Sequence, residues 1–465
     1  MYWLSSARSF AETTEWTYRI VTVVFGTALV LLCLLLGRGL GPPAAICAAI
    51  LTAISHAMVY YSRYYVQEMV FVFFTSATLV FAWRYARNPR FGWAIATGLC
   101  AGLMHATKET CVIAFAAMAV ALVCVLLWRR AAGGAESTQR RSHVGPILVA
   151  AAVAIAVSVV CYSTFFTNAR GPLDSVLTYA KYFQRAGTGS VHEKPWYYYL
   201  DLFAFSQYGR IWWSEGLVLG LAVVGLVLAL SGRGAGGGNV WLLRFIAIYT
   251  LAATLVYSAV PYKTPWSILG TFHGMILLAG VGAAGLVRLM PPLPLRVLLS
   301  LLLAGGGFHL ARQAYLGNYE YYDNERVNPY VYGHTSRDFL RLPQRLEALA
   351  DVCDDGHDMI IEVVAPESDF WPLPWYVRGF NGDRIGYYQS VPERFHNPVV
   401  VIATDNLSEG TDAGVAGAVA EQLGDGYLQE YYGLRPGGVL MAMFIRRDVW
   451  DKFILTRTNV RGKGR

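Results

Sequence analysis

Charged residues are scarce in this chain of 465 residues, and the scarcity is the first guide to its class. Only 15% of the residues are charged and 55% are hydrophobic, whereas soluble domains usually carry about 25% charge. The composition therefore favours a protein that lies in a lipid bilayer. The net charge of +7 does not indicate a nucleic-acid partner, because the basic residues form short clusters between apolar runs and no basic stripe interleaves with aromatic residues.

Several motifs are also missing. The seven cysteines form no CxxC pair, so neither a zinc site nor a disulfide framework is indicated. No GxGxxG or GxxxxGK[ST] segment opens a helix in the polar C-terminal part, so nucleotide binding has no support there. The opening segment MYWLSSARSFAETTEW is neither a signal peptide nor a membrane span.

Long apolar runs fill the first two thirds of the chain. A bilayer core needs roughly 20 apolar residues per helix, and the runs meet or approach that length, with 91–104 the shortest. We therefore predict an α-helical membrane bundle of about ten spans in residues 1–311. The runs lie at about 18–36, 42–61, 66–83, 91–104, 110–128, 145–166, 211–230, 245–260, 267–287 and 293–311.

Arginine indicates the orientation of the bundle. Alternate loops carry most of the positive charge, and by the positive-inside rule these loops are cytoplasmic. The opposite loops, and with them the C-terminal domain, then face outward from the cytoplasmic (inner) membrane. The arginines of the predicted inner loops are Arg38, Arg84, Arg87, Arg90, Arg129, Arg130, Arg140, Arg141, Arg233, Arg244, Arg288 and Arg296.

Ten spans with an outward C-terminal domain also place Met1 outside. We therefore expect that one upstream helix precedes this sequence. In the alternative, the first segment inserts as a hairpin with the second.

Residues 312–465 lack the long apolar runs of the preceding part of the chain. Helical patterns occur there at 336–350, 412–423 and 447–454. Strand-like runs occur at 358–364, 384–388, 399–403 and 438–445. Alternation of strands and helices predicts a soluble α/β layer domain.

The first candidate site lies at the turn between the second and third runs. Arg63 and Glu68 flank this turn, together with Tyr64 and Gln67. Arginine can bind a phosphate through two parallel hydrogen bonds, and a glutamate can accept a proton or bind a metal. Alternatively, Arg63 and Glu68 pair with each other and cap a helical hairpin. No ligand motif supports a particular metal.

Two more outer turns carry cations. The segment 105–110 contains His105, Lys108 and Glu109, and here Lys108 can neutralise a lipid-linked phosphate or simply extend its ammonium to the headgroups. The turn between the eighth and ninth runs contains Tyr262, Lys263 and Trp266 between or beside prolines. His273, farther along the ninth run, either faces the same cavity or is hydrogen-bonded inside the bundle, and His56 is interpreted in the same way.

The long outward segment 167–210 is rich in aromatic residues. It is typical of amphipathic helices and turns that lie at headgroup depth. Two interpretations stay open for this segment: an ordinary interfacial loop, or a lid over a substrate.

Four segments resemble the flippase-activity-associated family of membrane proteins, which is similar to GT-C-type glycosyltransferases such as protein O-mannosyltransferases and aminoarabinose transferases. The resemblance covers the chain from about 20 to 380. The segments are YYSRYYVQEMVFVFFT (60–75), HATKET (105–110), YKTPWSILGTFHGMILLAGVGAAG (262–285) and DFWPLPWYVRGF (369–380).

The resemblance implies a glycosyltransferase that uses a polyprenyl-phosphate-linked sugar on the outer face. It places Arg63, Gln67 and Glu68 near the donor phosphate, with Lys108 and Lys263 lining the same cavity. The sequence departs from the GT-C pattern at the acidic residue of the first outer loop, since its early carboxylates Glu12 and Glu15 lie in an unlike setting.

Two functions follow from these residues. The first is transfer of a sugar, with Glu68 and Glu109 as catalytic carboxylates and the cations binding the phosphate leaving group. The second is a non-catalytic partner of a flippase or export system that binds lipid-linked glycans through the same cations. A secondary transporter is disfavoured because the two halves show no internal repeat.

The orientation is testable with a reporter fused after Arg465. Because the arginine-rich loops are expected to be cytoplasmic, an alkaline phosphatase fusion should be active, and a fluorescent protein that matures only in the cytoplasm should stay dark. The reverse pair of results would show an odd error in the count of spans.

Overall fold

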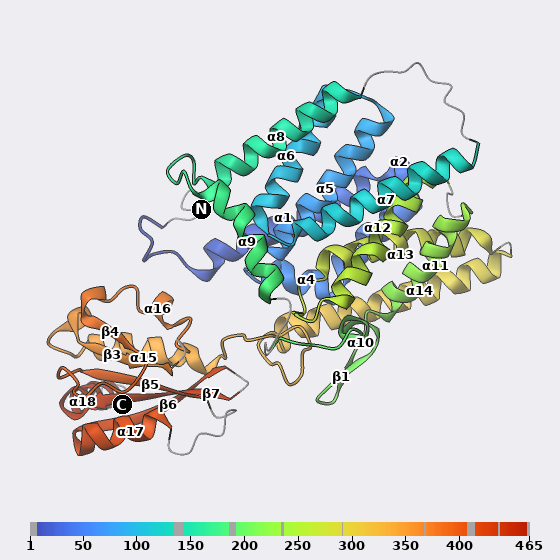
Figure 1. The fold of residues 1–465 in the computed structure, drawn as a ribbon. Coiled ribbons are helices and arrows are strands. Elements are labelled where there is room, and N and C mark those ends of the chain that lie inside the picture. The colour runs from blue at the N-terminus through green and yellow to red at the C-terminus, as the bar shows by residue number, and fades with distance from the viewer. Residues whose placement is uncertain are drawn as a thin grey trace. The chain divides into compact units, whose positions relative to one another are not determined.

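The computed structural model describes residues 7–133, 143–185, 192–233, 237–290, 292–366, 369–406, 414–435 and 438–462. The chain forms two compact units, one built mainly from Thr14–Tyr322 and the other from Asp323–Arg465 together with Ala7–Thr13 (Figure 1). The division lies beyond the expected boundary at residue 311, because helix α14 (Leu293–Tyr315) runs past it and the short π-helix η2 (Leu316–Glu320) follows.

The first unit is a bundle of helices, as the apolar runs predict. Among the described residues, seven helices are long and apolar enough to cross a membrane, or eight if the bent pair of α3 and α4 is one span. The two remaining runs form α6 and α11, of 17 and 16 residues. The helices at the ten runs are α1 (Glu15–Leu35), α3 (Pro42–Ile54) with α4 (His56–Arg63), α5 (Glu68–Arg87), α6 (Phe91–Thr107), α7 (Cys111–Ala131), α8 (Val144–Tyr162), α11 (Gly216–Ser231), α12 (Val240–Ala259), α13 (Leu269–Leu289) and α14.

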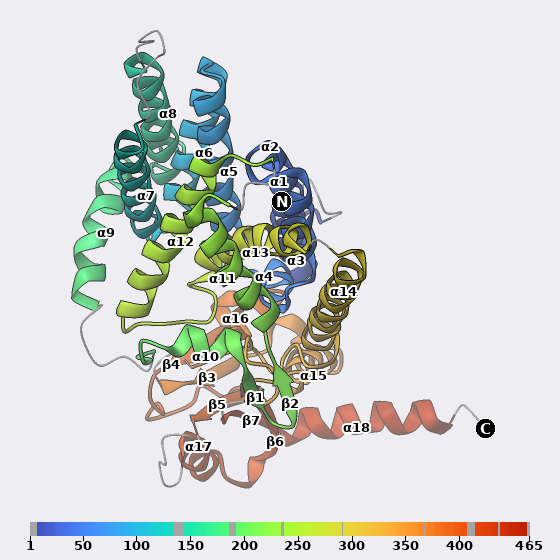
Figure 2. The same ribbon diagram turned by 90° about the vertical axis from the view of Figure 1, so that its right-hand side faces the viewer.

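Helix α13 lies at the centre of this unit, packed against α3, α5, α11 and α12 (Figure 2). Small residues allow its closest approach, to α11. A Cβ on Gly282 would lie 2.0 Å from the carbonyl oxygen of Leu221, and one on Gly225 would lie 1.9 Å from that of Leu278. Backbone contact of this kind is how apolar helices associate where no hydrophobic driving force separates protein from lipid.

The second apolar run is broken. Helices α3 and α4 meet at an angle of 57°, and Ser55 begins α4 by accepting a hydrogen bond from the Met58 amide. The bend separates the short helix that ends at Arg63 from the rest of the run. It therefore sets where the first candidate turn begins.

The arginine-rich loops gather at one end of the bundle. The guanidinium of Arg244, near the start of α12, lies 4.0 Å from the ring centre of Trp128 at the end of α7. Arg288, at the end of α13, donates to the carbonyl oxygen of Arg233 over 2.9 Å. Arg140 and Arg141 lie outside the described residues. The charge pattern read from the sequence thus corresponds to one face of the folded unit.

The long aromatic-rich segment 167–210 contains short elements among its described residues. Helix α9 (Gly171–Arg185) is amphipathic and follows α8, and α10 (Tyr198–Ala204) precedes a two-stranded hairpin. Strands β1 (Ser206–Tyr208) and β2 (Ile211–Trp213) form that hairpin. Exposed aromatic rings of this segment include Trp196, Phe205 and Trp212.

The second unit contains a five-stranded mixed sheet of order β4-β3-β5-β7-β6. Strand β3 pairs in parallel with β4 and β5, and β7 pairs antiparallel with β5 and β6. The sequence predicted four of these strands and missed the edge strand β6, whose polar and apolar residues alternate irregularly. The strands are β3 (Ile361–Val364), β4 (Ile385–Tyr388), β5 (Val400–Asn406), β6 (Tyr427–Arg435) and β7 (Val439–Arg446).

Helices cover both faces of this sheet. Ile361 and Val363 of β3 pack in one cluster with residues of α15 (Arg341–Ala350) and α18 (Arg447–Gly462), whereas Val364 packs with α17 (Val415–Leu423) on the other face. Successive side chains of a strand point to opposite faces, so both faces of β3 are apolar. The predicted α-helical membrane bundle with an α/β domain is confirmed as the fold class.

The segment 7–13 belongs to the second unit through aromatic and backbone contacts. Phe10 packs edge-on against Trp375, with 5.5 Å between ring centres. Arg378 lies 3.7 Å above the ring of Trp375 and donates a hydrogen bond to the carbonyl oxygen of Thr13.

Candidate functional site

Three turns named in the sequence analysis begin or end helices of the first unit. Glu68 is the first residue of α5, Lys108 directly follows α6, and Lys263 lies between α12 and α13. A polar residue at a helix end leaves the apolar interior of the helix intact, which is why these charges are found here. Their packing decides whether they form one site.

Glu68 and Lys108 form a buried ion pair. The Lys108 ammonium donates to Oε1 of Glu68, and both side chains are almost fully buried, with 7% and 2% exposure. The other oxygen, Oε2 of Glu68, has no hydrogen-bond partner among the described residues. A buried, partly unsatisfied carboxylate is costly and marks a candidate functional group.

Glu109 differs from Glu68 in being only partly buried. It lies within electrostatic range of Tyr179 on α9 and of Tyr257 on α12. Tyr257 is also within that range of Glu68, so its hydroxyl belongs to the same cluster. Burial, together with the hydrogen bond to Cys111, raises the pKa of Tyr179, which therefore stays a neutral donor.

His105 takes part in helix packing. Its Nδ1 lies 3.1 Å from the hydroxyl oxygen of Ser158 on α8. Its ring lies 5.1 Å from that of Tyr162, whose hydroxyl donates to the His105 carbonyl oxygen. These contacts attach the end of α6 to α8 beside the Glu68 cluster.

Lys263 is a second buried cation, but carbonyl groups surround it. Its ammonium donates to the carbonyl oxygen of Val260 and, over 3.3 Å, to that of Lys194. The Lys263 N–H donates a hydrogen bond over 3.0 Å to the carbonyl oxygen of His192, in the loop before α10. Burial lowers the pKa of the Lys263 ammonium. Tyr262, beside it, packs against the His192 ring at 4.9 Å.

Aromatic contacts connect the Lys263 turn to the first turn. The ring of Trp266 lies 6.4 Å from that of Tyr64 and 6.0 Å from that of Tyr61. The first turn leads directly into Glu68, which pairs with Lys108 of the remaining turn. The three turns that lie far apart in the sequence therefore converge.

Arg63 does not pair with Glu68. It is exposed, donates to the carbonyl oxygen of Asn318 over 2.8 Å, and lies 4.4 Å from the ring centre of Tyr319. Gln67 is exposed at the start of α5 and makes no capping hydrogen bond through its side chain. The alternative of an Arg63–Glu68 cap is thus not what the structure contains.

His273 lies apart from the three turns. It is buried in α13, where Nδ1 is 2.9 Å from the Ser76 hydroxyl and Nε2 is 3.4 Å from the Cys33 sulfur. Both ring nitrogens thus contact other helices of the bundle. His56 is likewise buried, with its ring 4.6 Å from that of Trp213.

The sequence analysis missed a buried glutamate. Oε1 of Glu215, the residue before α11, accepts hydrogen bonds from the Ser55 hydroxyl at 2.8 Å and the Ala57 amide at 3.0 Å. It thereby stabilises the positive end of α4 at the bend. A carboxylate inside the apolar run 211–230 was the signal in the sequence.

Within the described ranges, no group of three or more His, Cys, Asp or Glu side chains is arranged to bind a metal ion. The three turns supply the cations Lys108 and Lys263 and the carboxylates Glu68 and Glu109. They can bind an anion, orient a hydroxyl group and accept its proton.

Comparisons with known proteins agree with this architecture. A family model described as dolichyl-phosphate-mannose-protein mannosyltransferase matches residues 1–171. No curated protein matches the chain. The solved structure of ArnT from Cupriavidus metallidurans bound to undecaprenyl phosphate is 14% identical, with a TM-score of 0.58, and the match covers 92% of this chain and 84% of ArnT.

The apo structure of ArnT matches at 13% identity and a TM-score of 0.55, covering 92% of this chain and 83% of ArnT. At these identities the likeness shows the fold. The chain has the fold of GT-C-type glycosyltransferases, and the resemblance stated from the sequence is confirmed at that level. The association with a flippase stays a prediction.

The Glu68–Lys108 pair can be tested by its effect on stability. Lys108→Met should leave the Glu68 carboxylate buried without a counter-charge, at a cost of about 3–5 kcal/mol. The double variant Lys108→Met/Glu68→Leu should recover most of that loss, because no uncompensated charge then remains. Thermal unfolding of the purified chain in detergent measures both. Equal stability of the wild type and Lys108→Met would contradict the burial of this pair.

Proposed function

We propose that the chain is a membrane glycosyltransferase that moves a sugar from a polyprenyl-phosphate-linked donor to an acceptor hydroxyl at the outer face. The single observation that carries the proposal is the buried Glu68–Lys108 pair, joined to the Lys263 turn at one end of a GT-C-type bundle. A phosphate leaving group and a hydroxyl nucleophile need cations and a carboxylate in one place.

The ArnT structure in complex with undecaprenyl phosphate supports the choice of donor, and the mannosyltransferase family model over residues 1–171 supports the reaction class. Neither specifies the sugar or the acceptor for this chain.

Glu68 is the preferred general base. Lys108 occupies Oε1 and leaves Oε2 without a partner in the described part of the chain. Oε2 is therefore the carboxylate oxygen that can accept the proton of an acceptor hydroxyl. Glu109, partly exposed beside the pair, is the second carboxylate and can orient the acceptor.

The proposed transfer of the sugar assigns a role to each of these groups. Oε2 of Glu68 takes the proton of the acceptor hydroxyl as its oxygen attacks the anomeric carbon of the donor sugar. The bond from that carbon to the phosphate oxygen breaks, and its electron pair leaves with the polyprenyl phosphate. Lys108 and Lys263 stabilise the negative charge of the leaving group, and Arg63, with Tyr64 and Gln67, contributes to binding at the mouth.

A non-catalytic protein that binds lipid-linked glycans beside a flippase is the second candidate. The exposed guanidinium of Arg63, which stacks on the Tyr319 ring, favours this candidate. Binding of a phosphate requires a cation but no catalytic carboxylate. Turnover by the wild type distinguishes the two functions. Localisation in the cytoplasmic membrane, with the second unit outside it, is part of the proposal and is tested by the reporter fusions described above.

Glu68→Gln should abolish transfer. Because the buried Lys108 ammonium then loses its counter-charge, thermal unfolding of the variant is measured beside its activity, so that the rate is compared on folded protein. Glutamine retains an oxygen that can accept from Lys108 but cannot take a proton, so turnover should fall about 10²–10⁴-fold. Release of polyprenyl phosphate from a panel of polyprenyl-phosphate sugars, with the chain in nanodiscs, measures the rate.

Glu421→Gln makes the same chemical change at an exposed position of α17 and is the matched control. Full activity of Glu68→Gln would exclude Glu68 as the base. Donor binding by the wild type without any turnover of the panel would favour the binding protein instead.

Lys263 predicts a dependence on pH. Because burial lowers the pKa of the Lys263 ammonium, its positive charge is lost at a lower pH than that of an exposed lysine. Donor KM should therefore increase on the alkaline side, and Lys263→Arg should move this increase to higher pH. An identical pH profile of KM in the wild type and Lys263→Arg would show that Lys263 does not bind the phosphate.

A further inference from the structure

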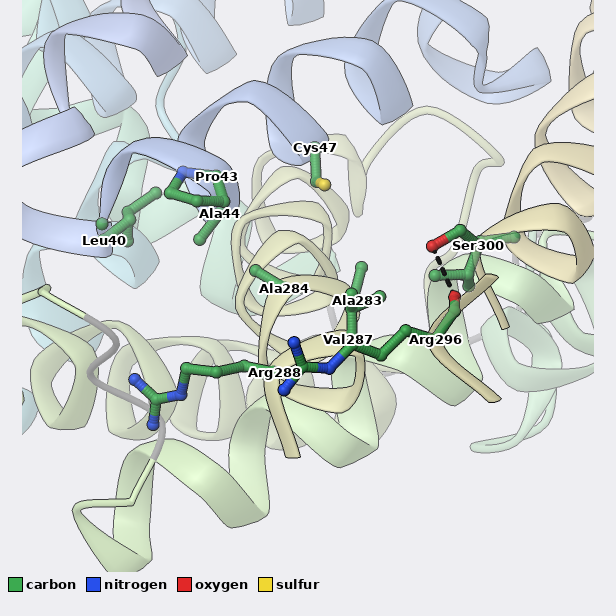
Figure 3. Close-up of a pocket in the computed structure, with 13 residues that line it drawn as sticks. Leu40, Pro43, Ala44, Cys47, Ala283, Ala284, Val287, Arg288, Arg296 and Ser300 are labelled. Atoms are coloured by element: carbon green, nitrogen blue, oxygen red, sulfur yellow. Dashed lines mark hydrogen bonds between the residues drawn. The ribbon is translucent and has the colours of Figure 1, made fainter. Parts of the chain in front are cut away.

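A cavity of about 480 Å³ lies at the arginine-rich end of the first unit. Its walls come from α3, α13, α14 and the residues just before α3 (Figure 3). The loops at this end include those with Arg233 and Arg288, which are joined by a hydrogen bond. The Lys263 turn precedes the opposite end of α13, and the Arg63 turn follows α4, beyond the opposite end of α3. The cavity is therefore separate from the proposed sugar site.

The lining of the cavity is apolar apart from one side. Pro43, Ala44 and Cys47 lie along one edge in Figure 3, and the side chains of Arg288 and Arg296 extend along the opposite edge. None of the described residues that line it is acidic. An anion with an apolar chain is therefore complementary to it in charge and in polarity.

Helix packing explains why the cavity is open beside α14. Helices α3 and α13 touch closely, since a Cβ on Gly280 would lie 2.4 Å from the carbonyl oxygen of Ala44. Helix α14, by contrast, is mostly exposed, and only 6% of its most apolar stretch is buried. Pro292, in an extended conformation, directly precedes α14. The gap between α14 and the tight pair faces the surroundings of the bundle.

Both arginines are exposed and can bind a ligand. Arg288 donates to the carbonyl oxygen of Arg233, and Arg296 donates through Nε to that of Met290. A guanidinium has five N–H donors, and the bonds recorded in the described ranges use one from each. Within those ranges neither arginine forms an ion pair with a carboxylate, unlike Arg345, which pairs with Glu430.

We propose that this cavity binds an anionic diacyl phospholipid of the leaflet at the arginine-rich end. The phosphate accepts hydrogen bonds from Arg288 and Arg296, and one acyl chain lies in the apolar gap between α3 and α14. Basic pockets between membrane helices on the cytoplasmic side are suited to anionic lipid headgroups, and the anionic lipids of that leaflet are abundant around them.

The test compares lipid retention by variants of the full chain purified in detergent. Native mass spectrometry measures the binding of phosphatidylglycerol and of phosphatidylcholine. Arg288→Gln/Arg296→Gln should weaken phosphatidylglycerol binding about 30-fold, because each arginine near an anionic lipid contributes about fivefold. Arg129→Gln/Arg130→Gln removes the same charge from the exposed end of α7, outside the cavity, and should change binding less than threefold.

A second variant tests the cavity without changing charge. Ser300→Phe places a ring in the gap from α14 and should also weaken phosphatidylglycerol binding while both arginines remain. Phosphatidylcholine should bind weakly to every form.

Three results would overturn the proposal. Equal losses in the two arginine double variants would indicate general attraction to surface charge. Unchanged binding by Ser300→Phe would exclude the cavity. Displacement of phosphatidylglycerol by a lower concentration of polyprenyl phosphate would assign the cavity to that lipid instead. None of these results depends on glycosyl transfer, so they leave the proposed function to its own test.

Discussion

The buried ion pair between Glu68 and Lys108 is the interaction on which the end of the bundle with the three turns depends. Two opposite charges with almost no exposure are stable only together, because removing one leaves the other without compensation in a medium of low dielectric constant. The pair joins the start of α5 to the end of α6. It also brings the Glu68 carboxylate to Lys108, which is followed in the chain by a second carboxylate, Glu109.

The two ends of the bundle differ in chemistry as a result. At the three turns, Lys108 pairs with the Glu68 carboxylate, and the ring contact between Tyr64 and Trp266 connects the Lys263 turn to the first turn. At the other end, the lining of the cavity beside Arg288 and Arg296 contains arginine without carboxylate. A sugar-phosphate site at the first end and a phospholipid site at the second are both consistent with one orientation of the protein in the membrane.

Small residues and a bend create the geometry between these ends. Gly225 and Gly282 bring α11 and α13 into backbone contact, which places α13 at the centre of the bundle. Glu215 stabilises α4 at its 57° bend from α3. The bend leaves α4 short, so that the turn after Arg63 can lead Glu68 toward Lys108. Neither the glycines nor Glu215 would take part in chemistry, but the position of the site depends on them.

The sequence by itself determined the class of protein, the ten apolar runs, the arginine-rich end and most strands of the second unit, because hydrophobic length, charge asymmetry and alternation are local properties of the chain. It also identified the turns that contain Glu68, Lys108 and Lys263. Tertiary structure alone decided which charges meet. Arg63 contacts Asn318, and His273 lies between Ser76 and Cys33, since partners more than 190 positions apart are chosen by helix packing and not by spacing along the chain.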